Sequence, residues 1–73
     1  MHVIACPLGR DVSLTLVSAD GSTWRFYSWS YRAQPLIVRP SPEDQERGFP
    51  SAELATVFFK TRYDSVLNQP TVR

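Results

Sequence analysis

Histidine and cysteine are the side chains best suited to nucleophilic or acid–base chemistry, and this 73-residue chain has one of each. His2 and Cys6 lie in a short apolar segment rich in β-forming residues. On an extended strand they share a face but are roughly 13 Å apart at about 3.3 Å per residue. Within one chain a histidine cannot take a thiol proton over that distance, so a dyad would require a dimer seam. We expect Cys6 to be a small buried hydrophobic residue.

The acidic residues form no paired catalytic site in the sequence. Asp11 and Asp20 fall in turn segments, where carboxylates cap local backbone amides. Glu43, Asp44 and Glu46 cluster in a proline-rich segment that brings no further metal ligands with it. With three glycines in the chain, there is no glycine-rich phosphate loop. The sequence therefore predicts no metal, no cofactor and no enzymatic activity.

Interface-type side chains instead gather on one segment, 23–32, which carries both tryptophans and two of the three tyrosines. Aromatic and arginine residues are enriched at protein interfaces and at their energetic centres. The same residue types could stack single-stranded bases, but a net charge of +1 argues against a nucleic-acid partner. A third interpretation is that these rings pack under the rest of the chain or across a homodimer seam. The candidate partner-binding residues are Arg25, Tyr27, Trp29, Tyr31, Arg32 and Arg62.

The segment that carries these residues is the second strand of a predicted hairpin, 12–18 and 22–32. A two-residue type I′ turn would pair Ala19 with Ser22, whereas a three-residue loop with Gly21 left-handed would pair Ser18 with Ser22. The choice decides which side chains share a face, because a one-residue slip exchanges the faces. We expect the three-residue loop, because it gives one apolar face. That face would hold Val12, Leu14, Leu16, Trp24 and Phe26, and the opposite face would hold Arg25, Tyr27, Trp29 and Tyr31.

Three further elements complete the predicted domain. A strand at 2–6 precedes the hairpin, and a short strand at 36–39 would lie at a sheet edge because prolines flank it. The proline-rich segment 39–50 is expected to be a solvated connection, with a partner-binding loop as the alternative. Ser51 caps a helix over 51–67, which Asn68 and Pro70 end.

Two details of the predicted helix remain open. Its segment 56–63 also has high β propensity, so a strand competes with the helix there. Arg62 falls inside the apolar stripe of the helix, so its stem extends over the sheet edge or its guanidinium meets a partner. The stripe covers several turns and starts at a good cap, which favours the helix. Lys60 and Asp64 are spaced to pair on the opposite side.

The sequence thus predicts one small α+β domain, with a three- or four-stranded, mostly antiparallel sheet and one C-terminal helix on one face. A chain this short, with one cysteine and no zinc-type spacing, must bury nearly all its large apolar residues or cover some with a partner. No segment has the length and hydrophobicity of a membrane span, and no leader-type pattern is seen, so a soluble, cytoplasmic setting is expected.

We expect a protein-binding module that regulates or inhibits a larger assembly, with another protein or a second copy of the chain as partner. Seven of its eight basic residues are arginine, which favours a GC-rich bacterial or phage genome. An inhibitor of a host system that a phage or mobile element encodes would fit this composition. The alternative is a nucleic-acid binder that uses an aromatic and arginine sheet face.

Overall fold

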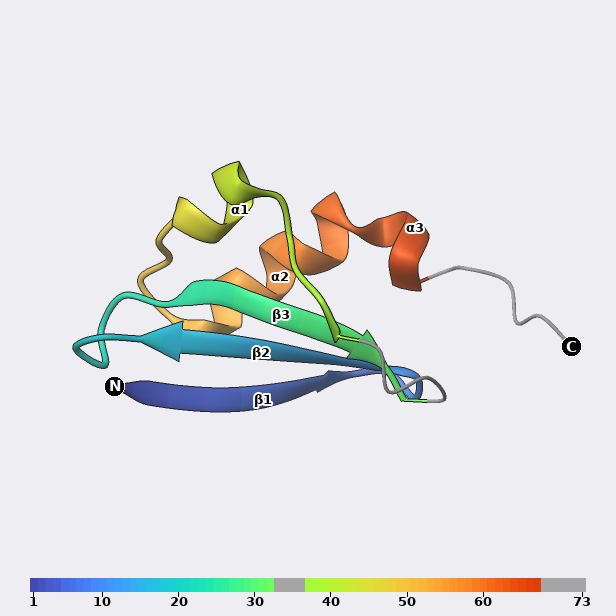
Figure 1. Cartoon of the computed structure of the whole chain (residues 1–73), viewed down its shortest axis with the longest axis horizontal. Helices are drawn as coiled ribbons and strands as arrows, with labels where there is room; N and C mark the ends of the chain where they lie inside the picture. The colour runs from blue at the N-terminus through green and yellow to red at the C-terminus, as the bar shows by residue number, and fades with distance from the viewer. Residues whose placement is uncertain (33–36, 68–73) are drawn as a thin grey trace, which may run out of the picture.

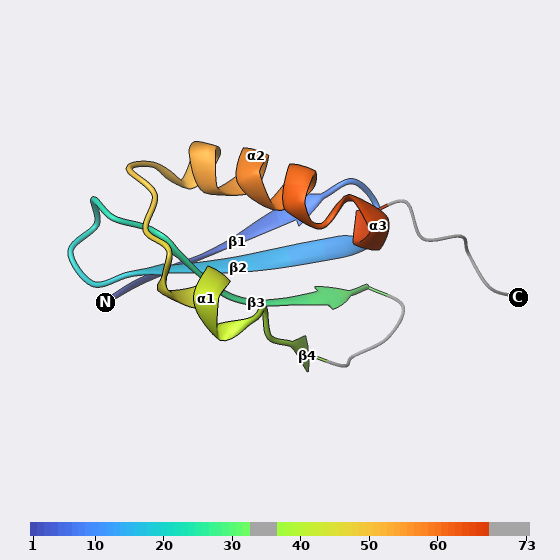
Figure 2. The ribbon, with the colours of Figure 1, turned by 90° about the horizontal axis from the view of Figure 1, so that it is seen from above.

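The computed structural model describes residues 1–32 and 37–67. One antiparallel sheet has the strand order β1-β2-β3-β4, with β1 at His2–Leu8, β2 at Val12–Ser18, β3 at Arg25–Tyr31 and β4 at Ile37–Val38. The described helices are α1 at Pro42–Glu46, α2 at Ala52–Arg62 and α3 at Asp64–Leu67. They stand on one side of the sheet, and no described helix covers the other side (Figures 1 and 2). The predicted α+β class is confirmed.

The first hairpin is longer than the sequence indicates. β1 was expected to end at Cys6 but continues through Pro7 to Leu8, which pairs with Val12. Proline is tolerated there because β1 is an edge strand, whose outward amide has no partner to lose. Gly9 turns the chain with a φ of 69°, a backbone conformation that L side chains rarely adopt.

The connection between β2 and β3 is neither of the two predicted turns. The first paired residues are Val17 and Arg25, so the loop is wide. The Oδ1 atom of Asp20 accepts hydrogen bonds from the amides of Ser22 and Thr23 at 2.9 and 3.1 Å. These local bonds replace ladder pairs that a tight hairpin would form, which is why the predicted pairing of Ser22 is wrong.

A β-bulge divides β3 and reverses part of the predicted face assignment. Leu16 pairs with Phe26, but the next residue back, Thr15, pairs with Ser28, so Tyr27 is the extra residue. Beyond the bulge, Leu14 pairs with Trp29. Near the turn the faces follow the prediction, with Phe26 in the core and Arg25 opposite. The prediction that Trp29 and Tyr31 lie on the opposite face is wrong. The extra residue shifts the alternation of side chains by one position, so both rings lie on the same face as Phe26.

The proline-rich segment is more structured than a solvated connection. Ser41 caps α1, and Pro42 stands in its first turn. Phe49 then pairs with Trp24, with 2.8 Å backbone hydrogen bonds in both directions. Asp44 and Phe49 are buried, so the expectation of a fully solvated loop is wrong.

The C-terminal segment is helical, but it forms two helices rather than one. The hydroxyl of Ser51 accepts from the amide of Leu54 at 3.1 Å, as the predicted cap requires, and the competing strand at 56–63 does not form. Tyr63 leaves helical geometry with φ −112° and ψ 38°, and α3 resumes at Asp64. The predicted stop at Asn68 and Pro70 lies outside the described residues.

The core forms where α2 crosses the sheet face on which the helices stand, here called the covered face. Phe26 lies at its centre. The centroid of its ring is 5.2 Å from the ring centroid of Phe49 and 5.6 Å from that of Phe59. The Trp29 ring is 6.4 Å from that of Phe59. The buried hydrophobic residues are Leu8, Val12, Leu14, Leu16, Phe26, Trp29, Phe49, Ala55 and Phe59.

Candidate protein interface on the open sheet face

The sheet face without helices, here called the open face, carries alternate side chains of all four strands. Cross-strand pairing arranges them in three rows: Val3, Val17 and Arg25; Ala5, Thr15 and Ser28; and Pro7, Ser13, Ser30 and Ile37. The middle of the face is small and hydroxyl-rich. Large apolar side chains lie toward its borders, where Val3 and Ile37 are 61% and 65% exposed.

Tyr27 is the large aromatic side chain of β3 on this face. The bulge places it next to Ser28 on the same side of the sheet, and Tyr27 is 43% exposed. The guanidinium of Arg39 lies 4.6 Å from the ring centroid and donates a hydrogen bond to the tyrosine hydroxyl at 3.2 Å. Arg39 follows β4, so the pair links the two strands and holds the ring in one orientation.

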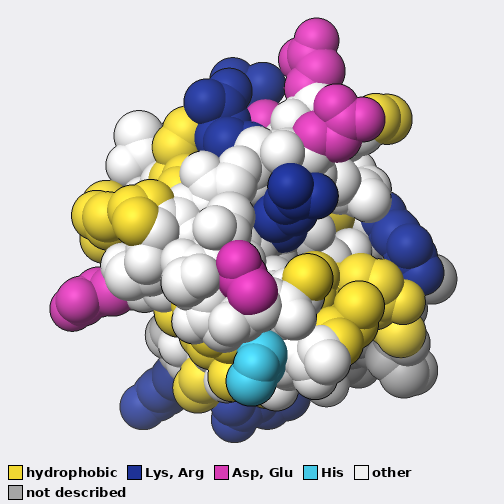
Figure 3. Space-filling model, turned by 90° about the vertical axis from the view of Figure 1, so that its left-hand side faces the viewer, with side chains coloured by type: hydrophobic (Ala, Val, Ile, Leu, Met, Phe, Trp, Pro, Cys, Tyr) yellow, Lys and Arg dark blue, Asp and Glu magenta, His cyan; other side chains and the backbone are white. Residues whose placement is uncertain are grey.

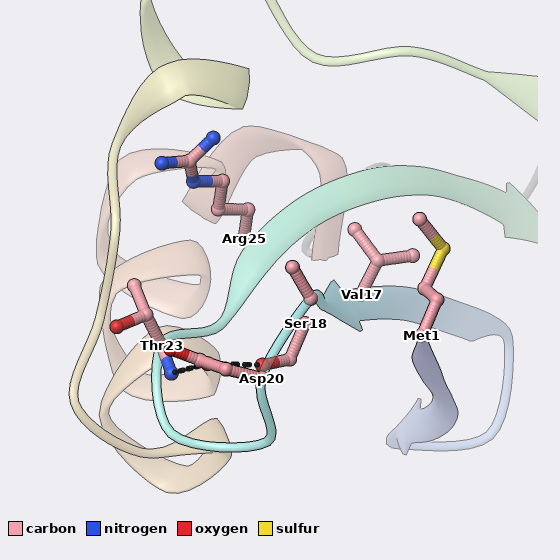
Figure 4. A pocket seen from close by; sticks show the side chains of 7 residues that line it. Met1, Val17, Ser18, Asp20, Thr23 and Arg25 are labelled. Atoms are coloured by element: carbon pink, nitrogen blue, oxygen red, sulfur yellow. Dashed lines mark hydrogen bonds between the residues drawn. The ribbon is translucent and has the colours of Figure 1, made fainter.

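Arg25 lies at the start of β3, on the border of the open face. It is exposed and forms no hydrogen bond or ion pair with another described side chain. It lines a shallow hollow of about 320 Å³, together with Met1, Val17, Ser18, Ala19, Asp20 and Thr23. Met1 and Val17 lie at the apolar end of this hollow, away from Asp20 and Thr23 (Figure 4).

The carboxylate of Asp20 is hydrogen-bonded to backbone amides of its own loop, which forms a wall of the hollow. The amides of Ser22 and Thr23 stabilise its carboxylate and lower its pKa to about 2, and the Ser18 hydroxyl adds a third hydrogen bond. The lining of the hollow therefore includes a carboxylate that the loop holds in place and the guanidinium of Arg25. The end of the molecule that carries His2 shows basic, acidic and hydrophobic side chains side by side, with no region of one charge sign (Figure 3).

Trp29 and Tyr31, by contrast, lie on the covered face of the sheet. Trp29 is 8% exposed in the core, and Tyr31 packs edge-on against it with the ring centroids 5.2 Å apart. Arg32 follows β3, where its backbone amide donates to the carbonyl oxygen of Asp11 at 2.6 Å. Of the six predicted residues, Arg25 and Tyr27 lie on the open face, Trp29 and Tyr31 on the covered face, and Arg62 on α2.

Arg62 contributes to a polar cluster around the buried Asp44 of α1. Its Nε donates to the Oδ2 atom of Asp44 at 3.3 Å, and the hydroxyl of Tyr63 donates to the same oxygen at 2.6 Å. Asp44 is 1% exposed. The Tyr63 hydrogen bond holds the pKa of Asp44 below its ordinary value, against burial, and the positive charge of Arg62 lowers it further. Burial and the nearby carboxylate raise the pKa of Tyr63.

Within this cluster, Arg62 pairs with a carboxylate of its own chain, while its side chain remains 52% exposed. Its carboxylate partner comes from a segment that was expected to be solvated. The signal that could have located Asp44 is the sequence Ser41-Pro42-Glu43, a helix cap followed by proline and an acid in the first turn.

Sequence reasoning also missed two exposed apolar residues on α2. Leu54 and Val57 are 51% and 55% exposed and lie three residues apart, so they are neighbours on the outer side of the helix. Their position follows from helical periodicity, because Ala55 and Phe59 face the sheet. They form a small apolar patch on the covered side of the molecule.

Among residues 1–32 and 37–67, no group of three or more His, Cys, Asp or Glu side chains could hold a metal ion. Within the same residues, no helix is both long enough and apolar enough to cross a membrane. Cys6 is half-buried on the covered face of the edge strand.

Comparison with protein-family models, with curated proteins and with solved structures found no match to this chain in any of the three.

Proposed function

We propose that this chain is a non-enzymatic, cytoplasmic protein-binding module that regulates or inhibits a larger assembly by docking a partner protein on its open face. The observation that carries the proposal is the arrangement around Tyr27. An exposed tyrosine is displaced outward by a bulge and held by Arg39, with the unpaired Arg25 nearby on the same strand. Tyrosine and arginine contribute most to binding when they are already ordered, because less conformational entropy is lost.

The chemistry of the open face fits a protein better than a nucleic acid. Stacking of successive bases needs several exposed rings along the groove. Trp29 and Tyr31 lie on the covered face, so Tyr27 is the one aromatic residue of β3 on the open face. The face combines exposed apolar residues with hydroxyl groups, and a non-obligate protein interface taken as a whole is about as apolar as the rest of a protein surface.

Photo-crosslinking tests this proposal at the residues that carry it. A photoreactive phenylalanine analogue replaces Tyr27 in the full chain, and a matched control carries it at the exposed Thr61 on α2. In lysate of the source organism we expect a discrete protein adduct from position 27 and none from position 61.

Substitutions at the same site make the test quantitative. Tyr27→Ala combined with Arg25→Ala should weaken capture of that protein by roughly 30-fold or more, as expected for loss of a hot spot. Tyr27→Phe retains the ring and should keep most of the affinity. Equal adducts from both positions, or an adduct that nuclease treatment removes, would contradict a protein interface on the open face.

A further inference from the structure

We propose that β1 pairs antiparallel with β1 of a second copy of this chain and joins the two sheets into one. β1 is the outermost strand of the sheet, and no described residue pairs with its outer edge. Its seven residues offer a long row of backbone donors and acceptors. An exposed strand edge of this kind is a template for a further strand.

The two edges of the sheet differ in how they are protected. β4 has two residues and is followed by Arg39 and Pro40, which shorten and block that edge. β1 contains no Asp, Glu, Lys or Arg, and Pro7 near its end is its only interruption. Isolated domains ordinarily protect a long edge with charges or bulges. A second copy can therefore lie against β1 without bringing like charges together.

Pro7 also sets the register of the proposed pairing. Proline is accepted in an edge strand where its nitrogen points away from the neighbouring strand. Strand periodicity then turns the amides of Val3 and Ala5 outward as well. An antiparallel pair centred on Ala5 sets Ala5 against Ala5 of the second copy and Val3 against Pro7 of the second copy. At that position Pro7 has to accept a hydrogen bond from Val3 but does not have to donate one. In this register every outward N–H of β1 from Val3 onward finds a carbonyl.

Charges on α2 are complementary under the same two-fold axis. Lys60 lines a small hollow with Leu8, Gly9 and Asp11, which places it over the far end of β1. Glu53 precedes it by seven residues, or close to two full turns, so it lies on the same side of the helix. α2 runs in the same direction as β1 (Figure 2). A two-fold axis through Ala5 reverses one copy, so Glu53 of each chain faces Lys60 of the other.

Neither charge has a competing partner among the described residues. Both side chains are exposed. The ion pair found among the described residues joins Arg62 to Asp44 and involves neither of them. The pairing also covers apolar surface. Ile4 and Cys6 are half-buried at the rim of the core and would face each other across the axis, and Val3 would lose exposed area.

This interface uses the sheet edge at β1, whereas the proposed partner surface centres on β3 and β4, so either proposal can fail without the other. The first experiment is sedimentation velocity of the full chain over a wide concentration range. We expect a reversible species of twice the 8.3 kDa monomer mass. A monomer at every concentration would overturn the proposal.

Ala5→Lys places two like charges opposite each other at the axis and should weaken the dimer by roughly a hundredfold or more. Thr15→Lys is the matched control, because Thr15 neighbours Ala5 on the open face but lies on an inner strand. It should leave the dimer intact. A dimer that is equally stable with Ala5→Lys would show that another surface mediates it.

The α2 charges give a second readout that leaves β1 unchanged. Glu53→Lys alone and Lys60→Glu alone should each weaken the dimer roughly tenfold, since two symmetric surface ion pairs are lost. The double exchange Glu53→Lys with Lys60→Glu should restore the wild-type dissociation constant. Failure of the exchange to restore dimerisation would refute this arrangement of the two copies, whatever the folding of Ala5→Lys.

Discussion

The aromatic residues on the two faces of β3 differ in burial and in the contacts that hold them. On the covered face, Phe26 and Trp29 are buried by the rings of Phe49 and Phe59. On the open face, Tyr27 remains exposed and is held by a single guanidinium from the adjoining strand. The covered face therefore stabilises the domain by burial, whereas the open face keeps an ordered ring in water.

The difference depends on one extra residue rather than on residue type. Without a bulge, strict alternation would send Phe26 and Trp29 to opposite faces, since they are an odd number of residues apart. The bulge at Tyr27 restores both to the core and leaves the extra tyrosine outside. A bulge can thus enlarge the core and present a side chain for binding at the same time.

Removal of a covered ring should have the largest effect. Trp29→Ala empties a core site and should lower the free energy of unfolding by about 3–5 kcal/mol. Because small domains have about 5–15 kcal/mol in total, much of the population is expected to unfold. Urea denaturation followed by circular dichroism measures the change. A Trp29→Ala variant as stable as wild type would contradict the placement of Trp29 in the core.

Loss of the buried polar contact should cost less. Tyr63→Phe removes the shorter donor to Asp44 and leaves a buried carboxylate with fewer partners. We expect a loss of about 1–3 kcal/mol in unfolding free energy. Tyr27→Phe is a control with the same chemical change at an exposed tyrosine, whose hydroxyl accepts a hydrogen bond from Arg39. Equal losses for the two variants would show that the Asp44 contact has no special weight.

Acid should also destabilise the fold, through the carboxylates of Asp44 and Asp20. The folded pKa of Asp44 lies below its unfolded value of 3.8, so the ionised carboxylate contributes stability above that pH and loses it as the pH falls through the folded pKa. Asp20 behaves in the same direction, with a folded pKa of about 2. We expect the urea midpoint to fall less between neutral pH and about pH 3 in Asp44→Asn than in wild type. An unchanged acid response would contradict the coupling.

Truncation on the open face should have the smallest effect on stability. Tyr27→Ala loses the contact with Arg39 and should change the unfolding free energy by about 1 kcal/mol or less. The same substitution should disrupt partner capture. Thermal unfolding of this variant beside Arg39→Ala shows whether the pair is structural, and a loss as large as that of Trp29→Ala would refute the contrast between the faces.

Much of the architecture was predictable from local patterns. The hairpin strand 12–18, the capping Ser51 and the edge strand near Ile37 follow from alternation, cap chemistry and flanking prolines. The core residues Val12, Leu14, Leu16 and Phe26 also follow, because one register alone gives a uniformly apolar face near the turn.

The candidate site was only partly predictable, because a bulge leaves no mark in residue types. Tyr27 and Arg25 were placed correctly on the open face, but the reversal beyond Tyr27 depends on tertiary packing of Trp29 against α2. The role of Arg62 depends on Asp44, which lies 18 residues away in another helix. Such long-range pairs are set by the packed fold and not by sequence spacing.

The most direct test of the bulge is a one-residue deletion. Deleting Tyr27 should join the pairs Leu16–Phe26 and Thr15–Ser28 into one regular ladder and leave the core residues on the covered face. Deleting Thr15 instead should turn Leu14 to the open face and destroy the core. Two-dimensional amide spectra and urea denaturation of both variants measure the outcome. We predict that the Tyr27 deletion folds with Trp29 buried and the Thr15 deletion unfolds, whereas unfolding of the Tyr27 deletion to the same degree would contradict this account of the two faces.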